Sequence, residues 1–174
     1  VTFTPDGTKL LVANEGEPSS YGQAGSVDPE GSVSIIPLSF NGVGSVNIGA
    51  PVTAGFGAFN GQAAALRAQG VRLFGPGASV AQDVEPEYIS VSADSRKAFV
   101  TLQEANALAT IDLTTGAVES IKSFGLKDHN APGNGLDASD QDGGINIRNW
   151  NVKGMYQPDS IASFQINGQT FHIT

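Results

Sequence analysis

The sequence contains no cysteine, only two histidines, and only 9 Lys and Arg among its 174 residues. The absence of cysteine excludes disulfides, thiol catalysis and cysteine-ligated zinc. The basic residues are opposed by 17 Asp and Glu, which leaves a net charge of −8. That balance argues against binding to nucleic acid or to anionic membranes, because both are bound by clustered Lys and Arg. It suits cations, or a saline exterior in which acidic surfaces stay soluble.

Long apolar runs and common catalytic motifs are also lacking. No run of 18 apolar residues occurs, so the sequence predicts no membrane span. A Gly-x-Ser-x-Gly elbow, a P-loop and a His-Glu-x-x-His motif are absent, so the familiar hydrolase signatures are missing. What is present is a hydrophobic share of 40% and 22 glycines, which is typical of a folded, loop-rich β protein.

Residues 85–124 form the clearest structural unit in the sequence. Short β-branched and aromatic runs are separated there by Asp, Asn, Ser and Gly, which is typical of antiparallel strands joined by turns. The predicted strands are Ile89–Ser92, Lys97–Leu102, Leu108–Leu113 and Val118–Phe124. Four strands in tandem make a small meander, the form of one blade of a β-propeller.

Parts of this unit recur elsewhere in the chain. Thr4–Ala13 aligns without gaps on Ser92–Thr101, with Asp, Lys and Val in identical places, and Val33–Ser39 matches Leu108–Thr114. A partial copy begins at Gln157. Self-similarity at this scale predicts an all-β fold, a partial β-propeller of four-stranded antiparallel blades, with chance likeness among the hairpins of a sandwich as the alternative. The predicted blade-like units span about residues 1–40, 85–124 and 157–174.

The segments between these units are predicted to be insertions, 41–84 and 125–156. The first carries one short helix, Gly61–Gln69, with Asn60 as its N-cap and Gly70 as its left-handed end. Long polar loops occupy residues 15–31 and the second insertion. The chain starts inside a strand pattern and stops in mid-strand, and a closed propeller needs at least about four blades. The sequence therefore predicts a piece of a longer propeller.

Glutamates stand at matching places in the repeat. Glu15 and Glu17 follow the second strand of the first copy, Glu104 follows the second strand of the middle copy, and Glu85 and Glu87 precede that copy's first strand. Equivalent strand ends of a propeller converge on one face, where carboxylates repel one another unless a cation joins them. Hard oxygen ligands suit Ca²⁺ or Mg²⁺, so Glu15, Glu17, Glu87 and Glu104 are predicted as an axial Ca²⁺ site. Alternatively, each glutamate solvates a loop or accepts a backbone N–H.

A second group of oxygens lies within Asn134–Asn146. Asp137, Asp140 and Asp142 could together bind Ca²⁺ in one tight loop, although the EF-hand pattern fails because Arg148 stands where its final Glu is needed. The alternative is a loop of Asx turns, in which the carboxylates accept hydrogen bonds from their own backbone.

The two histidines differ in context. His172 lies in a predicted strand and is expected to be a packing residue. His129, beside Asp128 in a loop, is the better candidate for acid/base catalysis or phosphate contact, although no motif surrounds it.

Six segments together resemble one known family, and they span nearly the whole chain: Leu11–Pro18, Asp28–Val33, Glu85–Tyr88, Lys127–His129, Gly133–Asp140 and Gly154–Asp159. In this order they resemble the choice-of-anchor I domain, a family of secreted or surface-anchored, propeller-like proteins. Some of its members are named alkaline phosphatases and others mesenchyme-specific cell surface glycoproteins. The resemblance implies an extracellular, periplasmic or cell-surface location.

Two functions follow as expectations. The first and favoured one is a calcium-stabilised extracellular module with a binding, adhesion or structural role toward a surface partner. The alternative is a Ca²⁺-dependent phosphoric ester hydrolase, in which axial carboxylates hold the ions that clamp a phosphorylated small molecule. The alternative also requires cations to neutralise the phosphate, for which Lys127, Arg148 and Lys153 are the candidates near the acidic loop.

Overall fold

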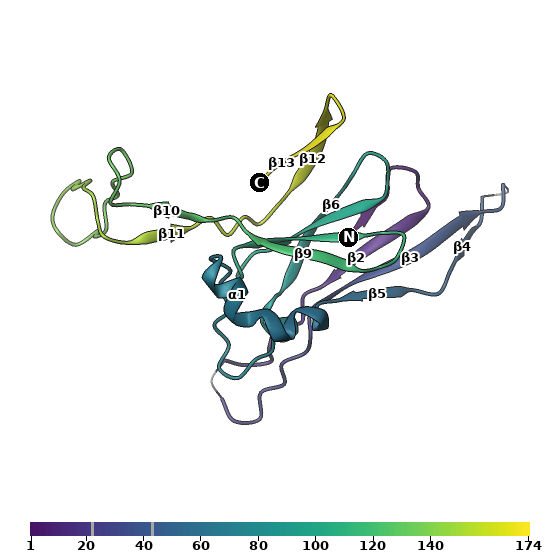
Figure 1. Cartoon of the computed structure of the whole chain (residues 1–174), viewed down its shortest axis with the longest axis horizontal. Coiled ribbons are helices and arrows are strands. Elements are labelled where there is room, and N and C mark those ends of the chain that lie inside the picture. The colour runs from purple at the N-terminus through teal and green to yellow at the C-terminus, as the bar shows by residue number, and fades with distance from the viewer. Residues whose placement is uncertain (22, 43) are drawn as a thin grey trace.

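The computed structural model describes residues 1–21, 23–42 and 44–174, and their regular structure is mostly antiparallel β-sheet. Two larger sheets, two hairpins and three short helical segments make up this part of the chain (Figure 1). In chain order the elements are β1 (Thr2–Phe3), β2 (Lys9–Asn14), β3 (Ser32–Phe40), β4 (Val46–Ile48), β5 (Val52–Gly55), η1 (Gly57–Gln62), α1 (Ala63–Ala68), α2 (Val80–Asp83), β6 (Pro86–Val91), β7 (Lys97–Leu102), β8 (Ala107–Asp112), β9 (Val118–Ser123), β10 (Leu126–Asp128), β11 (Lys153–Met155), β12 (Ala162–Ile166) and β13 (Gln169–Ile173).

The all-β prediction is confirmed, whereas the propeller remains a prediction. The described residues close into neither a propeller nor a barrel. They form two blade-like sheets, and a ring needs at least about four. Within the described residues, no helix has the length and apolarity that crossing a membrane requires.

The sheet β6-β7-β8-β9 is the meander that the sequence predicts for residues 85–124. Its inner strands alternate as a half-buried sheet should: Ala98, Val100 and Leu102 of β7 are buried, and so are Ala107, Ala109 and Ile111 of β8. The repeated alternation fixes the register, because a slip of one residue would turn every apolar side chain outward.

The other sheet is built around β3, which is long enough to pair with three strands. Its order is β1-β2-β3, with β5 paired to Ser32–Ile35 and β4 paired to Leu38–Phe40. The fourth strand of this blade-like sheet thus lies within 41–84, the segment assigned to an insertion from the sequence. β5 is short and mostly exposed, so no alternation of apolar and polar residues marks it.

One core joins the two sheets, since β2 lies against β6. Leu11, Val33 and Ile35 of the first sheet and Val100 and Ile111 of the second belong to the same buried cluster. Side chains of the helical segment complete the cluster: Phe56, Phe59, Leu66, Val71 and Leu73. Figure 1 shows this segment crossing one end of the sheets.

The predicted helix Gly61–Gln69 is present as η1 followed by α1, and Gly70 ends it with φ of 92°. The predicted role of Asn60 is wrong. Its side chain does not cap the predicted helix; instead its Oδ1 accepts a hydrogen bond at 2.9 Å from the amide of Ala81, in the first turn of α2. A partner 21 residues away gives no local signal in the sequence.

The turns that begin β2 and β7 have the same geometry, as their alignment predicts. The Thr4 amide donates to the Lys9 carbonyl at 3.0 Å, and the Ser92 amide donates to the Lys97 carbonyl at 2.9 Å. Each turn also has a left-handed residue, with φ of 70° at Gly7 and 60° at Ser95. The two turns touch, because the Asp6 amide donates to the Ser95 hydroxyl at 3.1 Å.

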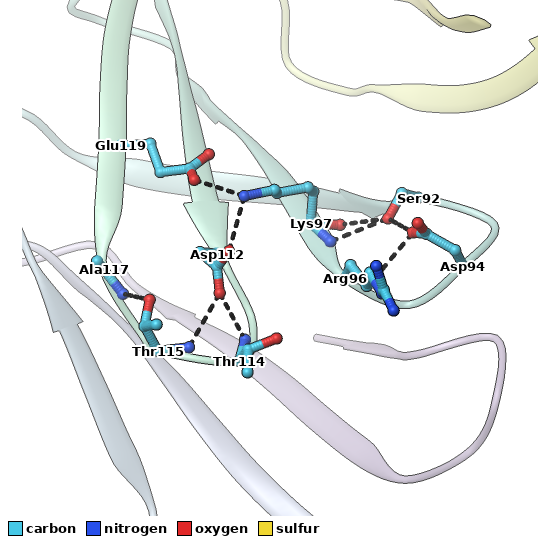
Figure 2. A network of polar contacts seen from close by, with 9 residues as sticks. All are labelled: Ser92, Asp94, Arg96, Lys97, Asp112, Thr114, Thr115, Ala117 and Glu119. Atoms are coloured by element: carbon cyan, nitrogen blue, oxygen red, sulfur yellow. Dashed lines mark hydrogen bonds and ion pairs between the residues drawn. The ribbon is translucent and has the colours of Figure 1, made fainter. Parts of the chain in front are cut away.

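An aspartate holds each of these turns closed. Asp94 accepts hydrogen bonds from the Ser92 hydroxyl and the Arg96 amide (Figure 2). Farther along the same sheet, the Lys97 ammonium contacts both Asp112 and Glu119, and these bonds raise the pKa of Lys97. The Lys97 bond and the amides of the β8–β9 turn lower the pKa of Asp112.

We expect Asp6→Asn to lower the melting temperature by a few degrees at neutral pH, and to have progressively less effect as the pH falls toward 2. The Thr4 hydroxyl, then the Thr8 amide, lower the pKa of Asp6 from 3.8 to about 2. A depressed folded-state pKa stabilises the fold above the unfolded value, and that stability is lost as the pH falls from 3.8 toward 2. Thermal melting of both proteins between pH 2 and 6 measures the difference, with exposed Glu30→Gln as the control. A difference that persists unchanged at pH 2 would contradict this cause.

Two hairpins project from the sheets. The arm, defined as residues 126–155, contains β10 and β11 and points away from the rest of the chain (Figure 1). The second hairpin, β12–β13, is tied to β6 because Ser163 accepts a hydrogen bond from Ser90 at 2.7 Å. His172 of this hairpin packs on Phe99 with ring centroids 4.2 Å apart, which agrees with its predicted packing role.

Candidate functional site

Five glutamates gather where β2 and β7 end and β6 begins, and they are called the glutamate cluster: Glu15, Glu17, Glu85, Glu87 and Glu104. The pairing explains why they meet. Pro86 at the start of β6 lies opposite Leu102 at the end of β7, and β2 runs beside β6. Residues far apart in the sequence are thereby brought to one end of the two sheets, as the repeat predicts.

Burial and mutual repulsion dominate the electrostatics of the glutamate cluster. Glu85 is only 4% exposed, and burial, followed by the charges of Glu104, Glu15, Glu17 and Asp83, raises its pKa to about 7. These neighbours are all acidic, so Glu85 holds its proton into the neutral range.

Two further members of the glutamate cluster titrate late for the same reasons. Burial, then Glu17 and Glu104, raises the pKa of Glu15. Burial, then Glu104, Glu15 and Asp159, raises the pKa of Glu87. Since each carboxyl feels several others, a cation bound among them would relieve more than one repulsion at once.

The backbone around the cluster is closely packed at Gly31. A Cβ at this position would lie 2.4 Å from the Val84 carbonyl oxygen and 2.9 Å from the Glu15 carbonyl oxygen. The Gly31 amide donates to the Ala81 carbonyl at 2.8 Å. Only glycine fits there, and it lets the segments bearing Glu15 and Glu85 approach each other.

None of the ion pairs formed by the described residues includes a member of the glutamate cluster, so no Lys or Arg side chain neutralises it there. Arg72 comes near, but its guanidinium donates to the backbone carbonyl of Glu104 and stacks on Phe74. One carboxylate oxygen of Glu104, Oε2, is buried without a hydrogen-bond partner.

Although the cluster is acidic, it is not a preformed metal cage. In the part of the chain that the structure describes, no three Asp, Glu or His side chains are arranged to hold a metal ion. A divalent ion would therefore have to draw the glutamates inward. The predicted Ca²⁺ site at Glu15, Glu17, Glu87 and Glu104 has the charge it needs but not the closed geometry.

The acidic loop of the arm is exposed, and it has the geometry of Asx turns. Asp137 accepts hydrogen bonds from the amides of Ser139 and Asn146, and Asp142 accepts one from the Asn146 side chain. Asp140 is exposed in the same loop. The structure thus separates the two predicted sites, with the glutamate cluster on the sheets and these aspartates in the projecting arm.

His129 and two of the three basic candidates for phosphate binding are engaged within the arm. The ring Nδ1 of His129 lies 2.8 Å from the Asn134 carbonyl oxygen. Arg148 stacks on Trp150 at 3.9 Å, and Lys153 pairs with Asp128 at 2.7 Å. These contacts stabilise the arm, and they engage the side chains of Arg148 and Lys153 with residues of the arm itself.

A pocket of about 260 Å³ lies beside the glutamate cluster, and Glu85 belongs to both. Asp28 and Asp83 also line this pocket, and neither was predicted from the sequence to be a functional residue. The alternation Asp83-x-Glu85-x-Glu87, which runs into the start of β6, was a usable signal for Asp83. Nothing local marks Asp28, which a long loop brings to the pocket.

The family model of the choice-of-anchor I domain matches residues 1–174. No curated protein and no solved structure matches the chain.

Proposed function

Because the chain belongs to the choice-of-anchor I domain family, which is linked to cell-surface anchoring, we propose that it is part of an extracellular or cell-surface binding module that Ca²⁺ stabilises. One observation supports the calcium part of the proposal: five glutamates converge at the strand ends with no basic partner in the described residues. Mutual repulsion of this kind is what a bound divalent ion removes.

The glutamate cluster is a better candidate for this ion than the arm loop. Glu85 is buried and Glu87 and Glu104 are half-buried, whereas Glu15 and Glu17 are exposed. The pairing of β6 with β7 and the contact of β2 with β6 bring the five together. In the arm, Asp137 and Asp142 already accept hydrogen bonds from their own loop. Carboxylates that lack partners gain more from an ion than carboxylates that must give up hydrogen bonds.

We expect Ca²⁺ to raise the melting temperature of the protein relative to EDTA, because the ion would bind only the folded arrangement. At a free concentration one hundred times the dissociation constant, the stabilisation is about 2.7 kcal/mol. Glu15→Gln combined with Glu104→Gln should abolish most of this response. The matched variant Asp140→Ala with Asp142→Ala removes two carboxylates from the arm and should preserve it.

Three outcomes of that melting experiment are informative. Loss of the response in the arm variant alone would move the site to the loop of Asp137, Asp140 and Asp142. Equal responses in all variants would rule out both sites. No response in the wild type would overturn the calcium proposal. The hydrolase alternative stays a prediction, which a phosphatase assay with and without Ca²⁺ tests.

A further inference from the structure

The pocket beside the glutamate cluster combines buried carboxylates with aromatic walls. Its lining includes Asp28, Asp83 and Glu85, together with Tyr21 and Phe74. Asp83 is only 7% exposed and Glu85 only 4%. No Lys, Arg or His is among the described residues that line it. Three acidic side chains therefore face one small volume that contains no balancing charge.

The oxygens of this pocket lack partners. Oδ1 of Asp28 and Oδ2 of Asp83 are buried and accept no hydrogen bond. The side chain of Glu85 has none among the hydrogen bonds and ion pairs of the described residues. A buried carboxylate oxygen without a donor costs the full loss of its hydration. A ligand that supplies N–H donors and positive charge would repay that cost.

Asp83 and Asp28 are positioned by hydrogen bonds that leave these oxygens without a partner. Oδ1 of Asp83 accepts the Gly75 amide at 2.8 Å, which leaves Oδ2 free. Asp28 is positioned through its backbone carbonyl, which accepts from the Gln82 side chain at 2.8 Å. Gln82 is itself fixed, because it forms a capping box with Ser79 at the start of α2. The carboxylate of Asp83 is therefore held directly, whereas Asp28 is held through its backbone.

The geometry favours an organic cation over a metal ion. No three acidic side chains of the described residues are close enough to coordinate one metal. An ammonium or guanidinium group is larger and directs several N–H donors outward, so it reaches oxygens that a single ion cannot. Aromatic faces such as those of Tyr21 and Phe74 also attract such cations. Phe74 already stacks against the Arg72 guanidinium at 3.6 Å.

We propose that this pocket binds an alkylammonium or alkylguanidinium group, the chemistry carried by a lysine or arginine side chain of a partner or by a free small amine. Charge-assisted hydrogen bonds to Asp28, Asp83 and Glu85 hold the head of the group, and Tyr21 and Phe74 contact its apolar stem. The pocket shares Glu85 with the glutamate cluster, but it does not include Glu15 or Glu104, the two residues on which the calcium proposal is tested.

The test is an NMR titration of the intact protein with n-butylammonium, n-butylguanidinium and uncharged n-butanol, in EDTA. We expect saturable shifts centred on the amide of Gly75, which bonds to Asp83, from at least one of the two cations. Butanol should bind about tenfold more weakly or not at all, since it lacks the charge-assisted bonds. A lysine- or arginine-containing peptide that binds tighter than the free amine identifies a partner side chain, and equal affinity identifies a free amine.

Variants decide whether the pocket is the site. Asp83→Asn should weaken binding about tenfold. Asp28→Asn, at a less buried position, should weaken it as well if Asp83→Asn does not fold. Glu30→Gln removes one exposed carboxylate from the same loop and should leave the affinity within about twofold. Glu15→Gln with Glu104→Gln should retain amine binding even if it abolishes the Ca²⁺ response.

Several results would overturn the proposal. Equal binding by Asp28→Asn and Glu30→Gln would show that the amine only screens the acidic surface. Shifts spread over the whole surface without saturation would show the same. Complete displacement of the amine by Ca²⁺ in the Glu15→Gln, Glu104→Gln variant would show that the pocket is a metal site instead.

Discussion

Replacing Asn106 by alanine is expected to lower the free energy of unfolding by about 3 kcal/mol. The side chain is fully buried, and its amide donates to the Gly125 carbonyl at 2.9 Å. Its Oδ1 accepts from the amides of Tyr156 and Gln157 at 3.0 and 3.2 Å. Alanine would remove three buried hydrogen bonds, each contributing about 1 kcal/mol. It would also strain a backbone with φ of 52°, which asparagine tolerates better.

Urea unfolding of Asn106→Ala and Asn106→Gly separates the two contributions. Both variants lose the hydrogen bonds, but glycine accepts the left-handed backbone, so it should be the more stable by about 1 kcal/mol. Ser95→Gly, at another left-handed position that is not glycine, provides a control that keeps the arm contacts intact. If Asn106→Ala unfolds within about 0.5 kcal/mol of the wild type, the three bonds do not stabilise the fold.

Glu85→Gln is expected to stabilise the protein above pH 7 and to have no effect below pH 4.5. Burial and the neighbouring carboxylates raise the pKa of Glu85 from 4.5 to about 7. Between these values the folded state retains a proton that the unfolded chain has released, so stability falls as the pH rises. The wild type should lose on the order of 2 kcal/mol across this window, and glutamine should lose little of it.

The measurement is chemical denaturation in EDTA at half-unit steps between pH 4 and 8. Exposed Glu30→Gln is the matched control and should follow the wild type. A stability difference between the wild type and Glu85→Gln that stays constant from pH 4.5 to 7 would contradict the buried, repelled state of Glu85. If Ca²⁺ binds the glutamate cluster, repeating the series with the ion should flatten the slope, because the ion favours the ionised carboxyl.

Local features of this fold could be predicted from the sequence. The turns at Asp6 and Asp94 are closed by hydrogen bonds between residues within a few positions of each other. Because the two segments have similar sequences, they form turns of similar structure. The alternation of apolar and polar residues predicted β7 and β8. The glycine at position 70 predicted the end of α1, where it adopts a left-handed backbone.

What depends on distant partners could not be predicted in the same way. Asparagine is a residue type that often caps helices, but the side chain of Asn60 accepts its hydrogen bond from the distant Ala81 amide. β5 is a strand only because it pairs with the edge of β3. The convergence of the glutamates could be predicted from the repeat. The burial of Glu85, and the lack of hydrogen-bond partners for one oxygen each of Asp28 and Asp83, depend on how a long loop folds back over α2.

The hydrogen bonds of Asn106 also bear on how the arm could be exchanged. One side chain holds both ends of this segment, the Gly125 carbonyl on the way out and the Tyr156 and Gln157 amides on the way back. The two ends are thereby tied to the sheet at the base of the arm, next to the Leu126–Met155 pair at which the β10–β11 pairing begins. We therefore expect the arm to tolerate changes in its length and sequence, or replacement by a grafted loop, without disturbing the sheet that holds Asn106.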